Sequence, residues 1–113
     1  MAIAPKTYDM TIQRRSDHTI GISVADGSSN AINLTGYTIS SQIWNPSRTT
    51  KAADASISIT NATGGTFNWT LTDAQTAQFT DDEYRYDVLL TNPSGLKEYW
   101  LEGIIFMDEG YTA

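Results

Sequence analysis

The sequence of 113 residues contains no cysteine, a single histidine and only three prolines. Without cysteine the chain has no disulfide bond, no thiolate ligand for a metal and no thiol nucleophile. A chain of this length buries roughly two-thirds of its unfolded surface, so it does not need such cross-links to fold. We therefore expect a single domain, residues 1–113, that is held together by its apolar core.

Basic residues and long apolar runs are also scarce. Seven Lys and Arg residues stand against thirteen Asp and Glu residues, which gives a formal net charge of −6 at pH 7. Proteins that bind the phosphate backbone of nucleic acids carry clustered Lys and Arg, and membrane spans need roughly 18–20 apolar residues in a row. The first ten residues include Lys6 and Asp9 and no apolar run, so we expect no secretory signal. We predict no nucleic-acid partner and no membrane partner.

The sequence is rich in alternating apolar and polar residues, which is typical of half-buried β-strands. Such runs begin near Tyr8, Ile20, Tyr37, Phe67 and Tyr84, and turn signals separate them. Turns about every 8 to 12 residues, without long amphipathic helices between them, are typical of an antiparallel sandwich or a small barrel. The pattern therefore predicts an all-β, antiparallel fold of seven or eight strands.

A few segments depart from this alternation. Thr72 is followed three residues later by Gln75, a capping-box pattern that predicts one or two helical turns over residues 73–78. We expect the Tyr84 hydroxyl to bind the backbone near those turns, as corner tyrosines do in sandwiches. Residues 47–54, which follow Pro46, are predicted to be a polar loop.

Two shorter features complete the expected first half of the chain. Asp26-Gly27 predicts a turn, and Ile32 and Leu34 predict a short strand. The predicted core consists of residues on the inward phase of each run: Ile20, Ile22, Val24, Leu34, Ile39, Ile43, Ile57, Phe67, Trp69, Leu71, Tyr84, Tyr86, Val88 and Leu90.

Residues that carry chemistry are few. No nucleophile elbow, metalloprotease motif or phosphate-binding loop accompanies His18, so we expect it to be an ordinary surface or edge residue. Asp81, Asp82 and Glu83 are adjacent carboxylates without EF-hand spacing; a solvated loop is the favoured interpretation, and a calcium site is the alternative. We predict that the chain is not an enzyme and has no catalytic residue, cofactor or metal ligand.

Binding features are concentrated in Trp44 and the last predicted strand. Trp44 ends a strand on the side opposite its apolar face, and exposed aromatic residues are enriched at protein interfaces. The last strand, from Leu96 to about Met107, is apolar on both faces. One face carries Tyr99, Leu101, Ile105 and Met107, and the other carries Trp100, Ile104 and Phe106.

A strand that is apolar on both faces normally needs cover on both sides. Either a bulge at Gly103 reverses its inward phase, or one face docks on another subunit, and we favour the partner. The predicted partner interface comprises Trp44, Tyr99, Trp100, Leu101, Ile105 and Met107.

Short runs along almost the whole chain, about residues 8–112, occur in an order that resembles a known family. In the first half these are Asp9-Met10-Thr11-Ile12, Thr19-Ile20-Gly21-Ile22-Ser23-Val24, Asp26-Gly27 and Ile32-Asn33-Leu34-Thr35-Gly36-Tyr37-Thr38-Ile39. In the second half they are Leu71-Thr72-Asp73-Ala74-Gln75-Thr76, Tyr84-Arg85-Tyr86-Asp87-Val88, Gly95 and Gly103-Ile104-Ile105. The order resembles the small immunoglobulin-like β-sandwich of virion proteins of tailed bacteriophages, including the N-terminal domains of baseplate upper proteins.

This resemblance implies an immunoglobulin-like antiparallel sandwich that does structural work. It implies a non-enzymatic adaptor in the tail or baseplate, at which fibres or other virion subunits attach, or alternatively a decoration protein on the capsid. The implied partners are other virion proteins and further copies of this chain in a symmetric particle. The implied location is the virion, assembled in the reducing cytoplasm of the host bacterium, which suits a chain without cysteine.

Two functions from other classes remain as alternatives. A carbohydrate-binding module would use Trp44 and nearby tyrosines, because exposed aromatic rings also contact sugars. A small hydrolase built around His18 is the least favoured hypothesis.

Overall fold

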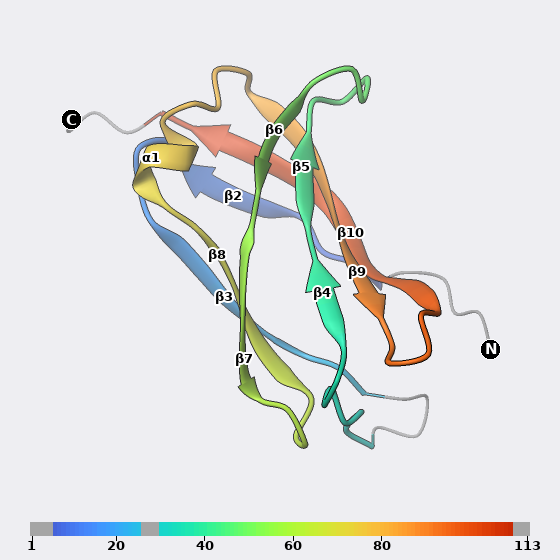
Figure 1. Ribbon diagram of the computed structural model, residues 1–113. Coiled ribbons are helices and arrows are strands. Elements are labelled where there is room, and N and C mark those ends of the chain that lie inside the picture. The colour runs from blue at the N-terminus through green and yellow to red at the C-terminus, as the bar shows by residue number, and fades with distance from the viewer. Residues whose placement is uncertain (1–5, 26–29, 110–113) are drawn as a thin grey trace.

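The computed structural model describes residues 6–25 and 30–109, which form ten β-strands and one short α-helix. The strands make a seven-stranded and a three-stranded sheet that pack face to face (Figure 1). β1 and β2 both pair with β10, and β4 and β5 both pair with β9, so each of these couples is one interrupted strand. Counted in this way, the described residues form a sandwich of eight strands, which agrees with the predicted seven or eight.

The larger sheet holds both ends of the described chain. Its strands, in spatial order, are β1 (Lys6–Thr7) and β2 (Met10–Gln13), β10 (Lys97–Asp108), β9 (Glu83–Thr91), β4 (Thr38–Ser40) and β5 (Gln42–Trp44), and β6 (Lys51–Asp54). β1 and β2 run parallel to β10, whereas the other pairs are antiparallel. Parallel strands need a long connection, and here most of the chain separates the two partners. The larger sheet is therefore antiparallel except at one edge, where β1 and β2 pair parallel with β10.

The smaller sheet consists of β3 (His18–Ser23), β8 (Thr66–Leu71) and β7 (Ser56–Asn61), in that order. β7 and β8 form an antiparallel hairpin, and its turn ends at Gly65 with a φ of 71°. A Cβ atom at Gly65 would lie 2.6 Å from the carbonyl oxygen of Ile32 and 2.7 Å from that of Val24. Only glycine therefore fits this turn against the neighbouring loop.

Helix α1 (Asp73–Thr76) follows β8 and has the predicted capping box. Thr72 Oγ1 accepts a hydrogen bond from the Gln75 N–H at 3.2 Å, and Gln75 Oε1 accepts one from the Thr72 N–H at 2.9 Å. The predicted corner tyrosine is also confirmed, because the Tyr84 hydroxyl accepts a hydrogen bond from the Asp81 N–H at 2.9 Å. These contacts hold the non-strand segment that connects β8 to β9 in place.

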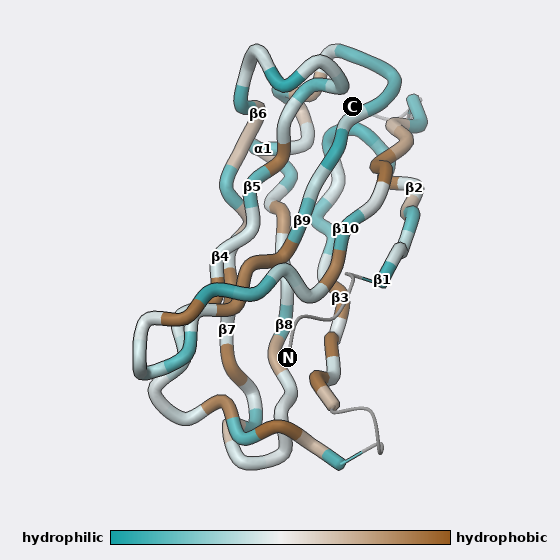
Figure 2. Tube along the Cα trace, turned by 90° about the vertical axis from the view of Figure 1, so that its right-hand side faces the viewer, coloured by the Kyte–Doolittle hydropathy of each residue, from teal (hydrophilic) through white to brown (hydrophobic). Residues whose placement is uncertain are grey.

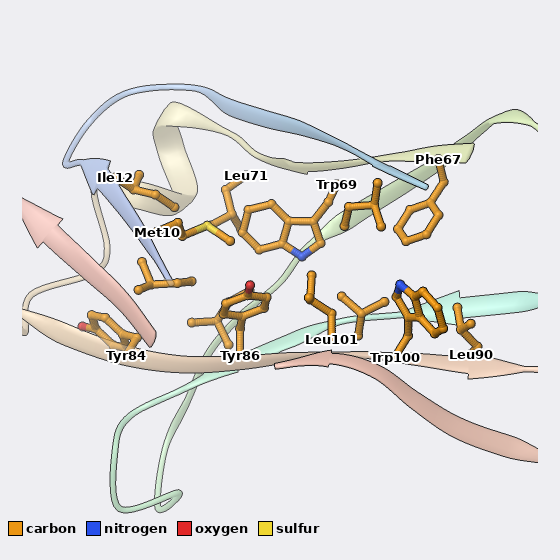
Figure 3. Close-up of a cluster of buried hydrophobic side chains, with 14 of the residues drawn as sticks. Met10, Ile12, Phe67, Trp69, Leu71, Tyr84, Tyr86, Leu90, Trp100 and Leu101 are labelled. Carbon is orange, nitrogen blue, oxygen red and sulfur yellow. The ribbon is translucent and has the colours of Figure 1, made fainter. Parts of the chain in front are cut away.

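The core lies between the two sheets (Figure 3). The predicted core residues Ile20, Ile39 and Ile57 are half-buried, and the other predicted members are buried. Among the described residues, the structure adds seven buried hydrophobic residues that the prediction omits: Met10, Ile12, Phe79, Trp100, Leu101, Ile105 and Met107. Figure 2 shows apolar positions recurring along the strands, as alternation requires, with mostly polar loops at the end near β6.

Three local expectations are corrected. Residues 47–54 are not all loop, because β6 pairs antiparallel with β5. Ile32 and Leu34 form no strand; Leu34 is buried, and its N–H binds the Ala62 carbonyl oxygen at 2.7 Å. The predicted run from Tyr37 is interrupted at Ser41, which separates β4 from β5. The predicted Asp26-Gly27 turn lies outside the described residues.

In the part of the chain that the structure describes, no helix is both long enough and apolar enough to cross a membrane.

Candidate functional site

A β-bulge in β10 decides which face of the last strand reaches the surface. Tyr99 is opposite Leu89 of β9, but Leu101 is opposite Val88, so Trp100 is the extra residue. Successive side chains of a regular strand point to opposite faces, and a bulge shifts that phase. Trp100 and Leu101 consequently both point into the core, as Figure 3 shows.

The structure divides the six predicted interface residues between the core and the surface. Trp100, Leu101, Ile105 and Met107 are each at most 8% exposed, so these four side chains are covered by the domain itself rather than available to a partner. Lys6 of β1 adds to this cover, with its ammonium 5.2 Å from the centre of the Trp100 ring. Tyr99 moves to the outer face, together with Ile104 and Phe106. Of the predicted interface residues, only Trp44 and Tyr99 therefore belong to the surface.

Gly103 has a different role from the predicted bulge. A Cβ atom there would lie 2.0 Å from the carbonyl oxygen of Tyr8, because the segment between β1 and β2 passes directly over it. The same carbonyl accepts a hydrogen bond from the Tyr86 hydroxyl at 2.5 Å, and Asp9 Oδ1 accepts one from the Ile104 N–H at 2.9 Å. Glycine within a strand can mark either a bulge or a close backbone approach, and here it marks the approach.

A groove of about 540 Å³ opens on the outer face of the seven-stranded sheet. We call it the outer-face groove and define it by Trp44, Arg48, Arg85, Asp87, Glu102 and Ile104, which line it. These residues come from β5, the β5–β6 turn, β9 and β10. Its volume lies within the range of small-molecule pockets. Trp44 is thus the predicted site residue that the structure places in a hollow.

The β5–β6 turn presents Arg48 to Trp44. Asn45 organises this turn, since its Oδ1 accepts hydrogen bonds from the N–H groups of Thr49 at 2.8 Å and Thr50 at 3.0 Å. Arg48 has a φ of 57°, and its guanidinium carbon lies 5.0 Å from the centre of the Trp44 ring. The Trp44 indole N–H donates to Gln42 Oε1 at 3.0 Å, which orients the ring. Trp44 is therefore held in a cation–π contact with its own chain.

Two carboxylates lie opposite each other on neighbouring strands of the groove. Asp87 of β9 is in register with Glu102 of β10, and both point outward. Burial raises the pKa of the Asp87 carboxyl, the charge of Glu102 raises it further, and the charge of Arg48 lowers it. Arg85 pairs at 3.6 Å with Glu83 on the same strand. The groove therefore combines an aromatic wall, paired acidic groups and two guanidinium groups.

Sequence reasoning did not identify Arg85, Asp87 or Glu102 as site residues. The alternation in β9 could have placed Arg85 and Asp87 on the side opposite Tyr84 and Tyr86. The pairing with Glu102 depends on the β9–β10 register, which the bulge at Trp100 sets.

The remaining candidate groups lie elsewhere. His18 begins β3 in the smaller sheet, with its ring centre 6.3 Å from that of Trp69, and burial lowers the pKa of its imidazole. Its Nε2 atom is buried and makes no hydrogen bond. Asp81 and Asp82 precede β9. Among residues 6–25 and 30–109, no group of three or more His, Cys, Asp or Glu side chains is arranged to hold a metal ion.

Comparison with known proteins identifies the fold. No protein-family model and no curated protein sequence matches the chain. Among solved structures, the crystal structure of the Lin-41 filamin domain is similar, with a TM-score of 0.53 and 10% sequence identity, covering 88% of this chain and 84% of that one. The predicted immunoglobulin-like class is therefore confirmed. A fold of this kind hosts many functions, so function has to be argued from the surface.

Proposed function

We propose that this chain is a non-enzymatic structural component of a bacteriophage virion, which attaches to another virion subunit through the outer face of its seven-stranded sheet. A tail or baseplate adaptor is the favoured placement, and decoration of the capsid is the alternative. The order of sequence motifs supports the assignment to a virion. The proposed partners are other virion proteins and further copies of the chain.

One observation carries the proposal of attachment through this face. The outer sides of strands in an antiparallel sandwich normally face water and are polar. Here Phe106 is 41% exposed and Tyr99 is 53% exposed, and the half-buried Ile104 and Leu89 lie on the same face. Together with Trp44, these residues form an apolar surface that extends over β5, β9 and β10. Such a surface suits contact with a protein.

The virion assignment is tested on purified particles. Mass spectrometry should detect the chain in virions that have been washed free of host protein, and cryo-electron microscopy should place it in the tail or on the head. Density in the tail or baseplate supports the adaptor, and density on the capsid supports decoration. Absence of the chain from washed particles would overturn the virion proposal.

The face that makes the attachment is tested with a matched pair of variants. Phe106→Ser removes an exposed aromatic side chain from the outer face, whereas Leu96→Ser removes a 70% exposed leucine from the β9–β10 turn. Phe106→Ser should reduce incorporation into particles severalfold, and Leu96→Ser should leave it unchanged. Equal incorporation of both folded variants would place the attachment elsewhere.

A carbohydrate-binding module is the second candidate, and the position of Trp44 in the outer-face groove favours it. The groove also offers carboxylates and guanidinium groups that can exchange hydrogen bonds with sugar hydroxyls. Binding on a glycan array that is lost in Trp44→Ala would support this function. Retention of that binding in Trp44→Ala would contradict a sugar site in the groove.

A further inference from the structure

The outer-face groove contains two acidic side chains, Asp87 and Glu102, that lie opposite each other and repel. Like charges directly opposite each other on antiparallel strands destabilise a sheet. Asp87 and Glu102 form such a pair, and within the described ranges neither carboxylate is in an ion pair. Stability alone does not favour two acids at these positions, whereas a cationic ligand between them would relieve their repulsion.

Arg48 shows which cation the groove accommodates. Its guanidinium already lies over the Trp44 ring, and its charge acts on the Asp87 carboxyl. It reaches this place from an exposed turn, with a left-handed backbone that residues other than glycine adopt at a cost. Because Arg48 is outside the core, it can leave the groove without disturbing the sandwich. The groove thus already holds one guanidinium group, which comes from its own chain.

We propose that the outer-face groove binds an arginine side chain of the partner protein, which takes the place of Arg48 against Trp44 and extends to Asp87 and Glu102. This inference rests on the proposed attachment to another protein and names the chemistry of that partner. A guanidinium is planar, so it both stacks on an indole ring and donates paired hydrogen bonds to carboxylates. An ammonium group has no such planar fork.

Charge and surroundings favour a protein partner over a sugar. The chain carries a net charge of −6, which favours the approach of a basic surface. Phe106 and Ile104 lie on the same outer face as the groove and provide apolar area on which the remainder of a protein partner can pack.

The experiment uses the whole chain, labelled with ¹⁵N and titrated with N-acetyl-arginine methylamide while amide and indole signals are followed by NMR. The Trp44 indole signal and the amides of Asp87 and Glu102 should shift and saturate. N-acetyl-lysine methylamide should bind roughly tenfold more weakly, and N-acetylglucosamine and mannose should cause no shift. Equal binding of the lysine and arginine probes, or shifts with the sugars alone, would overturn the proposal.

Three variants identify the groups responsible. Asp87→Asn with Glu102→Gln should weaken binding of the arginine probe by at least about tenfold, whereas Asp82→Asn, which removes the same type of charge outside the groove, should not change it. Arg48→Ala should strengthen binding about two- to fivefold, because it removes the internal competitor. Unshifted Trp44 signals in both the wild type and Arg48→Ala would refute the inference. Detection of the chain in virions is independent of this result, so the two proposals fail separately.

Discussion

The indole N–H of Trp69 donates a hydrogen bond of 2.9 Å to the hydroxyl oxygen of Ser41, across the space between the two sheets. The Ser41 hydroxyl in turn donates to the Asp87 carbonyl oxygen at 2.5 Å, and the side chains of Ser41 and Trp69 are both buried. The Ser41 carbonyl oxygen accepts a bond from the N–H of Ala55, where the chain passes from β6 in one sheet to β7 in the other. Ser41 thus links the central tryptophan to β9 at the interruption between β4 and β5.

Replacing Ser41 with alanine should destabilise the fold more than an ordinary serine substitution. The variant leaves the buried Trp69 N–H and the Asp87 carbonyl oxygen without their partner, and an unsatisfied buried group costs about 1–3 kcal/mol. Urea denaturation of Ser41→Ala should show a lower midpoint with an unchanged slope. Ser40→Ala, at the exposed neighbouring position, should change stability by less than about 0.5 kcal/mol. Equal midpoints for the two variants would show that the buried link contributes nothing.

Gly103→Ala tests the close approach of the first strands to β10. The added methyl group would lie 2.0 Å from the Tyr8 carbonyl oxygen, so the segment between β1 and β2 must move. We expect a loss of about 1–3 kcal/mol, which is typical of overpacking, and faster hydrogen exchange at the amides of β2. Gly21→Ala is the matched control, because its new methyl group would have an ordinary contact of 3.7 Å with Asn68 Oδ1. If β2 kept its protection in Gly103→Ala, the close packing of this segment would not be required.

The successes of sequence reasoning concern local patterns, and its failures concern the pairing of distant strands. Alternation located most of the core, the capping-box pattern located the Thr72 cap, and the corner-tyrosine rule located the Tyr84 hydroxyl contact, because each depends on residues close in sequence. β6 has the sequence Lys-Ala-Ala-Asp, which has little intrinsic preference for strand, and it is a strand because β5 offers it an edge. Local composition did not contain that information.

The candidate site was predictable only in part for the same reason. Trp44 stood out as an aromatic residue on the polar side of a strand. Tyr99 and Trp100 were assigned to the wrong faces of the last strand, because the bulge sits at Trp100, and no glycine or proline marks that position. The Asp87–Glu102 pair follows from the resulting register, so no local motif could reveal it.

His18 should make the stability of the domain sensitive to mildly acidic pH. Burial lowers the pKa of its imidazole below 6.5 in the folded state, so the unfolded chain binds the proton more readily. The contribution of neutral His18 is complete above about pH 6.5 and is lost as the pH falls from there toward the lowered folded value. Urea midpoints measured at pH 7.5 and 5.5 should therefore differ more in the wild type than in His18→Phe, which keeps a ring beside Trp69. The same pH dependence in both proteins would assign the effect to other groups.

Asp87→Asn should raise the stability of the domain at neutral pH, although it removes a group that we assign to partner binding. Burial and the charge of Glu102 raise the pKa of the Asp87 carboxyl, so its ionised form is disfavoured in the folded state. The sign of this effect is opposite to that of His18: the cost is present above the raised folded pKa and is relieved as the pH falls through it. Removing the charge at pH 7 should stabilise the fold by a few tenths of a kcal/mol, because the partly exposed pair is screened by water.

The same comparison separates electrostatic repulsion from a packing effect of the amide. Added salt screens the Asp87–Glu102 repulsion in the wild type, so the stability difference between wild type and Asp87→Asn should shrink between low salt and 0.5 M NaCl. It should also shrink as the pH falls through the raised folded pKa, where the wild-type carboxyl takes up its proton. Asp82→Asn, which lowers the net negative charge equally outside the groove, should give a smaller gain. A lower midpoint for Asp87→Asn at neutral pH would mean that its carboxylate stabilises the fold, and the acidic pair would then need no ligand to account for it.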